Sequence, residues 1–112
     1  MLRSSGWLRG VFAVCAAATI GLPRHASAQT AAQVARAAIA AAEGRGAATA
    51  ADLATIRAGT RRGDIETARA AIRALGRLER PGLIPDLLIT LRSILPEVRA
   101  ETATALAQAA RG

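Results

Sequence analysis

A repeat within the second half of the chain restricts its possible folds more than any other feature. Residues 67–76 align with residues 98–107, thirty-one residues further on. Both segments carry apolar side chains three and four positions apart, which places them on one face of an α-helix. Such self-similarity is typical of stacked supersecondary units, each of which buries its apolar face against its neighbours. We therefore expect a repeating helical architecture.

The same helical spacing continues from residue 30 to the C-terminus, and no stretch alternates apolar and polar residues as a strand would. The predicted fold class is all-α, with about five helices. Their expected ranges are residues 30–43, 50–59, 65–79, 83–93 and 96–111.

Capping residues mark several of these helix ends. Residues 49–52 (Thr-Ala-Ala-Asp) resemble a capping box in which Asp replaces Glu. Asp64 is a favourable N-cap for the third helix, and Pro96 suits the first turn of the fifth. Residues 44–46 (Gly-Arg-Gly) end the first helix, and Gly112 suits the position just beyond the last one.

The apolar positions predict which helix faces are buried. The first helix is expected to bury a single stripe, made of Val34, Ala35, Ala38, Ile39 and Ala42. The fourth helix is expected to be buried on more than one side, because its apolar residues surround it. They are Leu83, Ile84, Leu87, Leu88, Ile89 and Leu91. The inward residues of the third helix are Ile65, Ala68, Ile72, Leu75 and Leu78, and those of the fifth are Val98, Thr102, Ala105, Leu106 and Ala109.

Two segments carry a resemblance to a known family. Residues 81–88 (Pro-Gly-Leu-Ile-Pro-Asp-Leu-Leu) and the helix that contains Val98, Arg99 and Leu106 resemble the linker, first helix and second helix of a HEAT repeat. The resemblance extends over residues 64–112, whereas the preceding residues match only in their number of helices. It implies a short right-handed α-solenoid of antiparallel helical hairpins.

The chain departs from the HEAT family in the polar residues at its turns. Many HEAT repeats place an Asp at the turn within each hairpin, facing an Arg of the next helix, but here Ser93 and Arg62 occupy the turns. Arg99 stands at the Arg position, whereas Ala68 occupies it one unit earlier. Leu95 stands where an Asp usually caps the helix. We therefore expect no polar ladder and a stack that relies on aliphatic packing.

Residues 1–28 have the three parts of a secretory signal peptide. Arg3 and Arg9 form the positive region, residues 11–22 the apolar core, and residues 23–25 (Pro-Arg-His) a helix break before the small residues Ala-Ser-Ala. Cleavage is predicted between Ala28 and Gln29, which would leave residues 29–112 as the mature domain.

Two other interpretations of this segment are weaker. An uncleaved signal anchor would need about 20 apolar residues to cross a membrane, and the run of residues 11–22 is shorter. A lipoprotein would be anchored through Cys15, but the residue before it is Val14 rather than a small one. We therefore expect a periplasmic or secreted protein that contacts the membrane only during export, through its signal peptide.

The predicted mature chain lacks most of the side chains that carry out chemistry. Its Cys, Trp, Phe and His residues all precede Gln29, and the whole chain has no Tyr, Lys or Asn. Ser93 is the only serine left, with no His or Lys to activate it. Transition-metal sites need His or Cys ligands, and no calcium-binding motif is present. We expect no catalytic residue, cofactor or metal, and so no enzyme activity in this chain.

The charge of the mature chain is modest. Loss of the arginines before Gln29 leaves twelve arginines against eight acids, a net charge of about plus four. Scattered arginines without aromatic side chains for base stacking make nucleic acid an unfavoured partner. Two clusters have a second interpretation as sites for an acidic partner, although a helix-terminal role or a solvated face is favoured for them. They are Arg57, Arg61 and Arg62, and Arg69, Arg73, Arg77 and Arg80.

These features predict a scaffold or adaptor that binds another protein. The last helix has no polar outer face after Leu106, so the array is expected to be incomplete and to receive a partner or further repeats. The resemblance offers an alternative, since some exported HEAT-like arrays precede a peptidyl-prolyl isomerase domain. In that case these residues would be the accessory N-terminal segment of a larger enzyme.

Overall fold

The computed structural model describes the backbone of residues 24–112 and the side chains of residues 27–112. In this part of the chain there are five α-helices, one short 3-10 helix and no strand, which confirms the all-α prediction. The helices are α1 (Arg24–Gly44), α2 (Ala50–Gly59), α3 (Ile65–Arg77), α4 (Ile84–Thr90) and α5 (Pro96–Ala109), and the 3-10 helix η1 (Pro81–Leu83) leads into α4.

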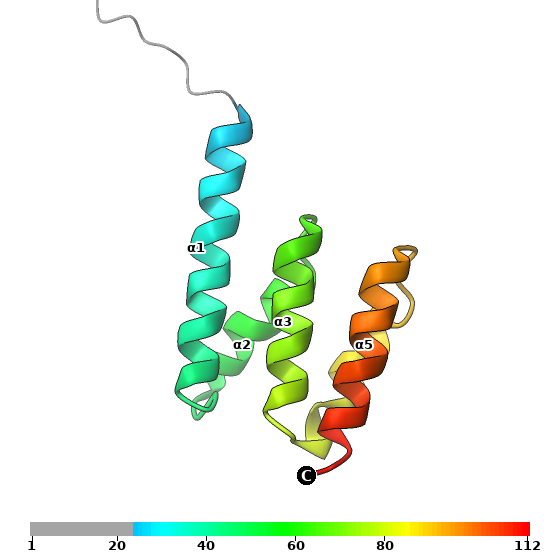
Figure 1. Ribbon diagram of the computed structural model, residues 1–112. Coiled ribbons are helices and arrows are strands. Elements are labelled where there is room, and N and C mark those ends of the chain that lie inside the picture. The colour runs from blue at the N-terminus through cyan, green and yellow to red at the C-terminus, as the bar shows by residue number, and fades with distance from the viewer. Residues whose placement is uncertain (1–23) are drawn as a thin grey trace, which may run out of the picture.

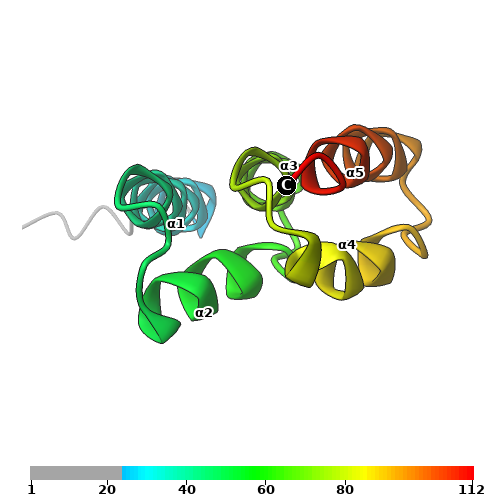
Figure 2. The same cartoon turned by 90° about the horizontal axis from the view of Figure 1, so that it is seen from below.

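The helices form two layers (Figures 1 and 2). The long helices α1, α3 and α5 lie side by side in one layer, and the short helices α2 and α4 lie in the other, as Figure 2 shows from below. In the first layer α3 is central, with α1 packed on one side and α5 on the other. Only α3 therefore has a long-helix neighbour on both flanks.

The first helix is longer than the sequence predicts. Arg24 and His25 do not break a helix but form the first turn of α1, which continues without interruption to Gly44. The alanine-rich sequence explains this, because alanine has the highest helix propensity. The apolar core predicted for the signal peptide, residues 11–22, lies outside the described part of the chain.

Helix caps follow the sequence prediction closely. The Thr49 side chain accepts a hydrogen bond of 3.1 Å from the Asp52 backbone N–H, and Asp64 accepts one of 3.0 Å from Thr67 N–H. Pro96 opens α5. Leu95 supplies no side-chain cap there, and its own N–H donates to Ser93 Oγ at 3.2 Å. The predicted N-caps are therefore confirmed where the side chain can accept a hydrogen bond.

The core lies between the two layers and is built from alanine and a few large aliphatic side chains. Its fully buried large side chains include Ile56, Ile72, Leu75 and Leu87. The predicted stripe of α1 is correct at Ile39 and Ala42 but wrong at Val34, which is 65% exposed, and at Ala38, which is also exposed. The reason is that α1 packs on neighbours at one flank only, so that the opposite flank faces solvent.

Burial in α2 and α4 repeats with the spacing that the sequence shows. The buried residues of α2 are Asp52, Ile56 and Gly59, and thirty-one residues later Leu83, Leu87 and Thr90 are buried at the start, middle and end of η1 and α4. The two short helices therefore present equivalent faces to the long-helix layer.

The fourth helix is less buried than the sequence predicts. Leu88 is 49% exposed, Ile89 is 68% exposed and the following Ile94 is 89% exposed. In the described part of the chain, α4 packs mainly on α5 and its Leu87 enters the common core, so the rest of its apolar circumference stays exposed. The prediction of a helix buried on several sides is wrong, and its apolar residues instead form surface.

Candidate binding surfaces

Polar contacts between neighbouring helices recur through the stack. Arg57 of α2 meets Asp86 of α4 through two hydrogen bonds, Nε to Oδ1 and Nη2 to Oδ2, both 3.1 Å. Such paired geometry between a guanidinium and a carboxylate is directional as well as electrostatic. This ion pair fixes the register of α2 against α4.

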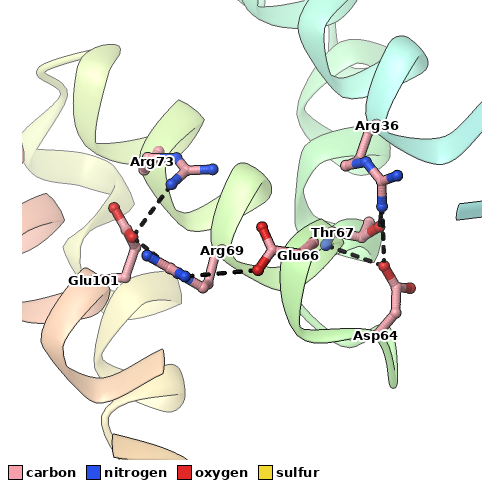
Figure 3. A network of polar contacts seen from close by, with 7 residues as sticks. All are labelled: Arg36, Asp64, Glu66, Thr67, Arg69, Arg73 and Glu101. Carbon is pink, nitrogen blue, oxygen red and sulfur yellow. Dashed lines mark hydrogen bonds and ion pairs between the residues drawn. The ribbon is translucent and has the colours of Figure 1, made fainter. Parts of the chain in front are cut away.

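The long-helix layer has its own set of such contacts (Figure 3). Arg69 and Arg73 of α3 both approach Glu101 Oε2 of α5, at 3.2 and 3.5 Å. The side chain of Glu101 is only 13% exposed, and these two guanidinium groups are its ion-pair partners. On the other flank of α3, Arg36 of α1 donates to Asp64 Oδ2 at 3.4 Å and to Thr67 Oγ1 at 3.2 Å.

At the opposite end of α3, further contacts join it to α1. Arg77 forms an ion pair with Glu43, in which Nη2 lies 3.0 Å from Oε2. Arg80 donates to the backbone carbonyls of Gly46 and Ala47 in the turn that follows α1. Both ends of the α1–α3 interface are therefore held by arginines.

These contacts correct the expectation of a stack without a polar ladder. Inter-helix ion pairs connect α1 to α3, α2 to α4 and α3 to α5, between residues 28 to 34 apart. The HEAT pattern does not predict these ion pairs, because it concerns the turn and helix positions that Ser93 and Ala68 occupy in this chain. Here the acids lie at an N-cap, within α4, within α5 and near the end of α1.

Two of the carboxylates have a pKa that the fold lowers. Asp52 has a pKa below its ordinary value, chiefly because the Arg45 guanidinium donates to its Oδ1 at 3.1 and 2.7 Å. Hydrogen bonding from Thr67 lowers the pKa of Asp64, and Arg62 adds to the effect. The second oxygen of Asp52, Oδ2, is buried and has no hydrogen-bond partner.

The arginines on α3 and just beyond it do not form the free solvated face that was favoured for them. Arg69 and Arg73 contact Glu101, Arg77 contacts Glu43, and Arg80 binds backbone carbonyls. Their partners lie within the chain, so they are not free to meet an acidic partner. In the other cluster, Arg57 and Arg62 are also paired, with Asp86 and Asp64.

The distal flank is the name we give to the side of α4 and α5 that faces away from α2 and α3. Each residue advances about 100° around an α-helix, so Leu88 and Leu91 lie about 200° and 140° around α4 from Asp86, which faces α2. By the same measure Ala103 and Leu106 lie about 200° and 140° around α5 from Glu101, which faces α3. The distal flank thus carries apolar side chains, together with the exposed Arg99, which lies about 160° around α5 from Glu101.

The predicted signal cleavage site lies within α1. Ala28 and Gln29 are both exposed and line one end of an open groove of about 760 Å³. Cleavage between them would remove the first five residues of α1, from Arg24 to Ala28, and would leave a helix that starts one residue from the predicted start at Thr30. This part of the prediction remains an expectation.

Neither a metal-binding cluster nor a membrane-spanning helix is found among residues 24–112. No group of three or more His, Cys, Asp or Glu side chains there is arranged to hold a metal ion. None of the helices in that range combines the length and apolar character needed to cross a membrane. The surfaces that remain are therefore the distal flank and the grooves between helix ends.

Comparison of the chain with protein-family models, curated proteins and solved structures gave no match. Its function is therefore argued from the geometry alone.

Proposed function

We propose that residues 29–112 are a HEAT-like α-solenoid domain that is exported to the periplasm or secreted, and that it acts as a protein-binding scaffold. The two-layer arrangement of alternating long and short helices supports the repeat interpretation. The thirty-one-residue spacing of burial in α2 and α4 supports it as well. Solenoid repeats present extended surfaces that suit protein binding.

The observation that carries this proposal is the contrast between equivalent positions of α3 and α5. Ala68, Ile72 and Leu75 of α3 are 5%, 0% and 0% exposed. The residues thirty-one positions later are Arg99, Ala103 and Leu106, of which the first two are exposed and the third is half-buried.

The difference has a structural cause, because α5 packs on α3 and Leu87 of α4 joins the same core, whereas no described element covers α5 in the same way. Within this chain, a helical hairpin is what buries a flank of this kind. The distal flank therefore fits a further helical hairpin, with Leu88 and Leu91 of α4 and Leu106 of α5 at the contact. Isolated apolar side chains on a surface are ordinary, but a contiguous apolar set on one flank marks an interaction site.

The proposal has two forms, which differ in the origin of the hairpin that would cover the distal flank. In the first, a partner protein supplies it and the chain is an adaptor. In the second, the same polypeptide supplies it, as expected if this domain is the accessory segment of a larger exported enzyme such as a peptidyl-prolyl isomerase. The intact mass of the native protein from periplasm or medium distinguishes them, because a mass equal to that of residues 29–112 fits only the adaptor.

The binding role is tested by retention of proteins from an envelope extract of the source organism, followed by their identification. The wild-type domain is compared with Leu88→Glu and Ala103→Glu, both at exposed positions of the distal flank, and with Val34→Glu as the matched control on the exposed side of α1. We expect the wild type and the control to retain the same protein, and both distal-flank variants to lose it. Equal retention by all four proteins, or retention of none, would refute the proposal.

A further inference from the structure

Two arginines occupy equivalent places just after the two short helices, and neither has a carboxylate partner within the described part of the chain. Arg61 follows α2 and Arg92 follows α4, thirty-one residues apart. Their backbone N–H groups make the same contact, to the carbonyl three residues earlier, at 3.2 Å in each case. Both side chains are exposed. The repeat therefore places a guanidinium at the same point of each successive unit.

A groove lies between these two points. It has a volume of about 280 Å³ and runs from the α2–α3 turn to the α4–α5 turn. Its apolar lining includes Ile65, Ile89, Leu95 and Val98, and its basic lining consists of Arg61, Arg62 and Arg92. No Asp or Glu side chain is among the residues that line it. The groove is thus apolar and positively charged.

Among the residues whose side chains the structure describes, most arginines are paired with a carboxylate, but two of the three that line this groove are not. The arginines of the inter-helix contacts meet Asp86, Glu101, Glu43 or Asp64, and Arg45 meets Asp52. In the groove, Arg62 shares Asp64 with Arg36. Within the described part of the chain no carboxylate contact is found for Arg61 or Arg92, nor for Arg80, Arg99 and Arg111 outside the groove. Arg61 and Arg92 therefore give the groove a positive charge that no carboxylate of its lining offsets.

Arg61 and Arg92 each follow the C-terminal end of a helix, where a cation interacts favourably with the helix dipole. That interaction accounts for a positive residue at each position. It does not account for the apolar groove between them or for the absence of acids from its lining. The combination matches the chemistry of a ligand that is both acidic and aliphatic.

We propose that this groove binds an acidic peptide segment, in which carboxylate side chains meet Arg61 and Arg92 and an aliphatic side chain between them contacts Ile65 and Ile89. Guanidinium groups bind carboxylates through directional, charge-assisted hydrogen bonds. The inference rests on the protein-binding role proposed above and names the chemistry of one bound segment. It concerns a different surface from the distal flank.

The test uses fluorescently labelled synthetic peptides in which two glutamates flank Leu-Leu, with spacers of different length, and matched peptides with glutamine in place of glutamate. Binding to the domain is measured by fluorescence anisotropy. We expect saturable one-to-one binding for at least one glutamate peptide. We also expect about a tenfold weaker affinity for the R61Q/R92Q double variant, the loss that about 1.4 kcal/mol produces.

Arg111→Gln is the matched control, because Arg111 is also exposed but follows the C-terminal end of α5, whereas the groove lies at the start of that helix. It should bind the glutamate peptide as the wild type does. The inference is overturned if no glutamate peptide binds, if R61Q/R92Q binds as tightly as the wild type, or if the glutamine peptide binds equally well. Tighter binding of a single-stranded oligonucleotide than of any peptide would also overturn it.

The outcome can be separated from that of the proposed function. If no peptide binds while the distal flank still retains a partner protein, only the proposal that the groove binds an acidic peptide is refuted. Peptide binding without any retained protein would refute the role of the distal flank and leave the groove intact.

Discussion

Arg57 of α2 and Asp86 of α4 are joined by two hydrogen bonds of 3.1 Å, Nε to Oδ1 and Nη2 to Oδ2. The pair connects two short helices that lie in the same layer and belong to successive hairpins. It is the counterpart, in the short-helix layer, of the ion pairs that join α1, α3 and α5 in the long-helix layer.

The strength of this ion pair is the first prediction. The two side chains are 39% and 27% exposed, so solvent screens the charges partly. A double-mutant cycle with Arg57→Ala and Asp86→Ala should give a coupling energy of about 0.5 to 1 kcal/mol in urea unfolding, and less at high salt. Additive single effects would show that the pair does not couple the helices.

Gly76 allows the close approach of α3 and α5. A Cβ on Gly76 would lie 2.7 Å from the Cα and 2.8 Å from the Cβ of Ala105. Gly76→Ala should destabilise the domain, because overpacking of about 1 to 3 kcal/mol exceeds the roughly 1 kcal/mol that alanine gains in a helix.

The matched control for that substitution is Gly82→Ala, because a Cβ on Gly82 meets nothing within 4 Å. Its unfolding free energy should stay within about 0.5 kcal/mol of the wild type. Equal stability of the two variants in urea titrations would contradict the packing seen between α3 and α5.

Two adjacent leucines of α4 give the third prediction. Leu87 is fully buried, whereas Leu88 is 49% exposed on the distal flank. Leu87→Ala should lower the free energy of unfolding by about 2 to 5 kcal/mol. Leu88→Ala should change it by no more than about 0.5 kcal/mol. Chemical denaturation of the domain alone measures both. A large loss for Leu88→Ala would mean that the distal flank is covered in solution.

The fourth prediction concerns acid. The pKa values of Asp52 and Asp64 are lowered in the folded state, from an ordinary value of 3.8. At pH values well above 3.8 both carboxylates make their full contribution to the stability of the fold. This contribution is lost as the pH falls below 3.8 and reaches the lowered pKa values. Asp52→Asn and Asp64→Asn should each reduce the loss of stability between about pH 5 and pH 2. Thermal unfolding across that range tests it, and an unchanged pH dependence in both variants would contradict it.

The sequence by itself determined the class of the fold and most helix boundaries. Helical spacing and caps depend on neighbours along the chain, so Asp64, Thr49 and Pro96 could be assigned without any tertiary information. The thirty-one-residue repeat also predicted equivalent positions, and it could have revealed that Arg61 and Arg92 correspond. That correspondence lies outside the aligned segments of residues 67–76 and 98–107, which belong to the long helices.

The tertiary structure decided which equivalent positions are covered. Ile72 and Ala103 share the same place in the repeat, yet only Ile72 is fully buried, because burial depends on the hairpin that packs against it and not on local spacing. For the same reason the apolar residues of α4 are exposed, and Glu101 meets Arg69 from a distant part of the chain. Local periodicity shows that a helix has an apolar face, whereas only the arrangement of the neighbouring helices determines what that face contacts.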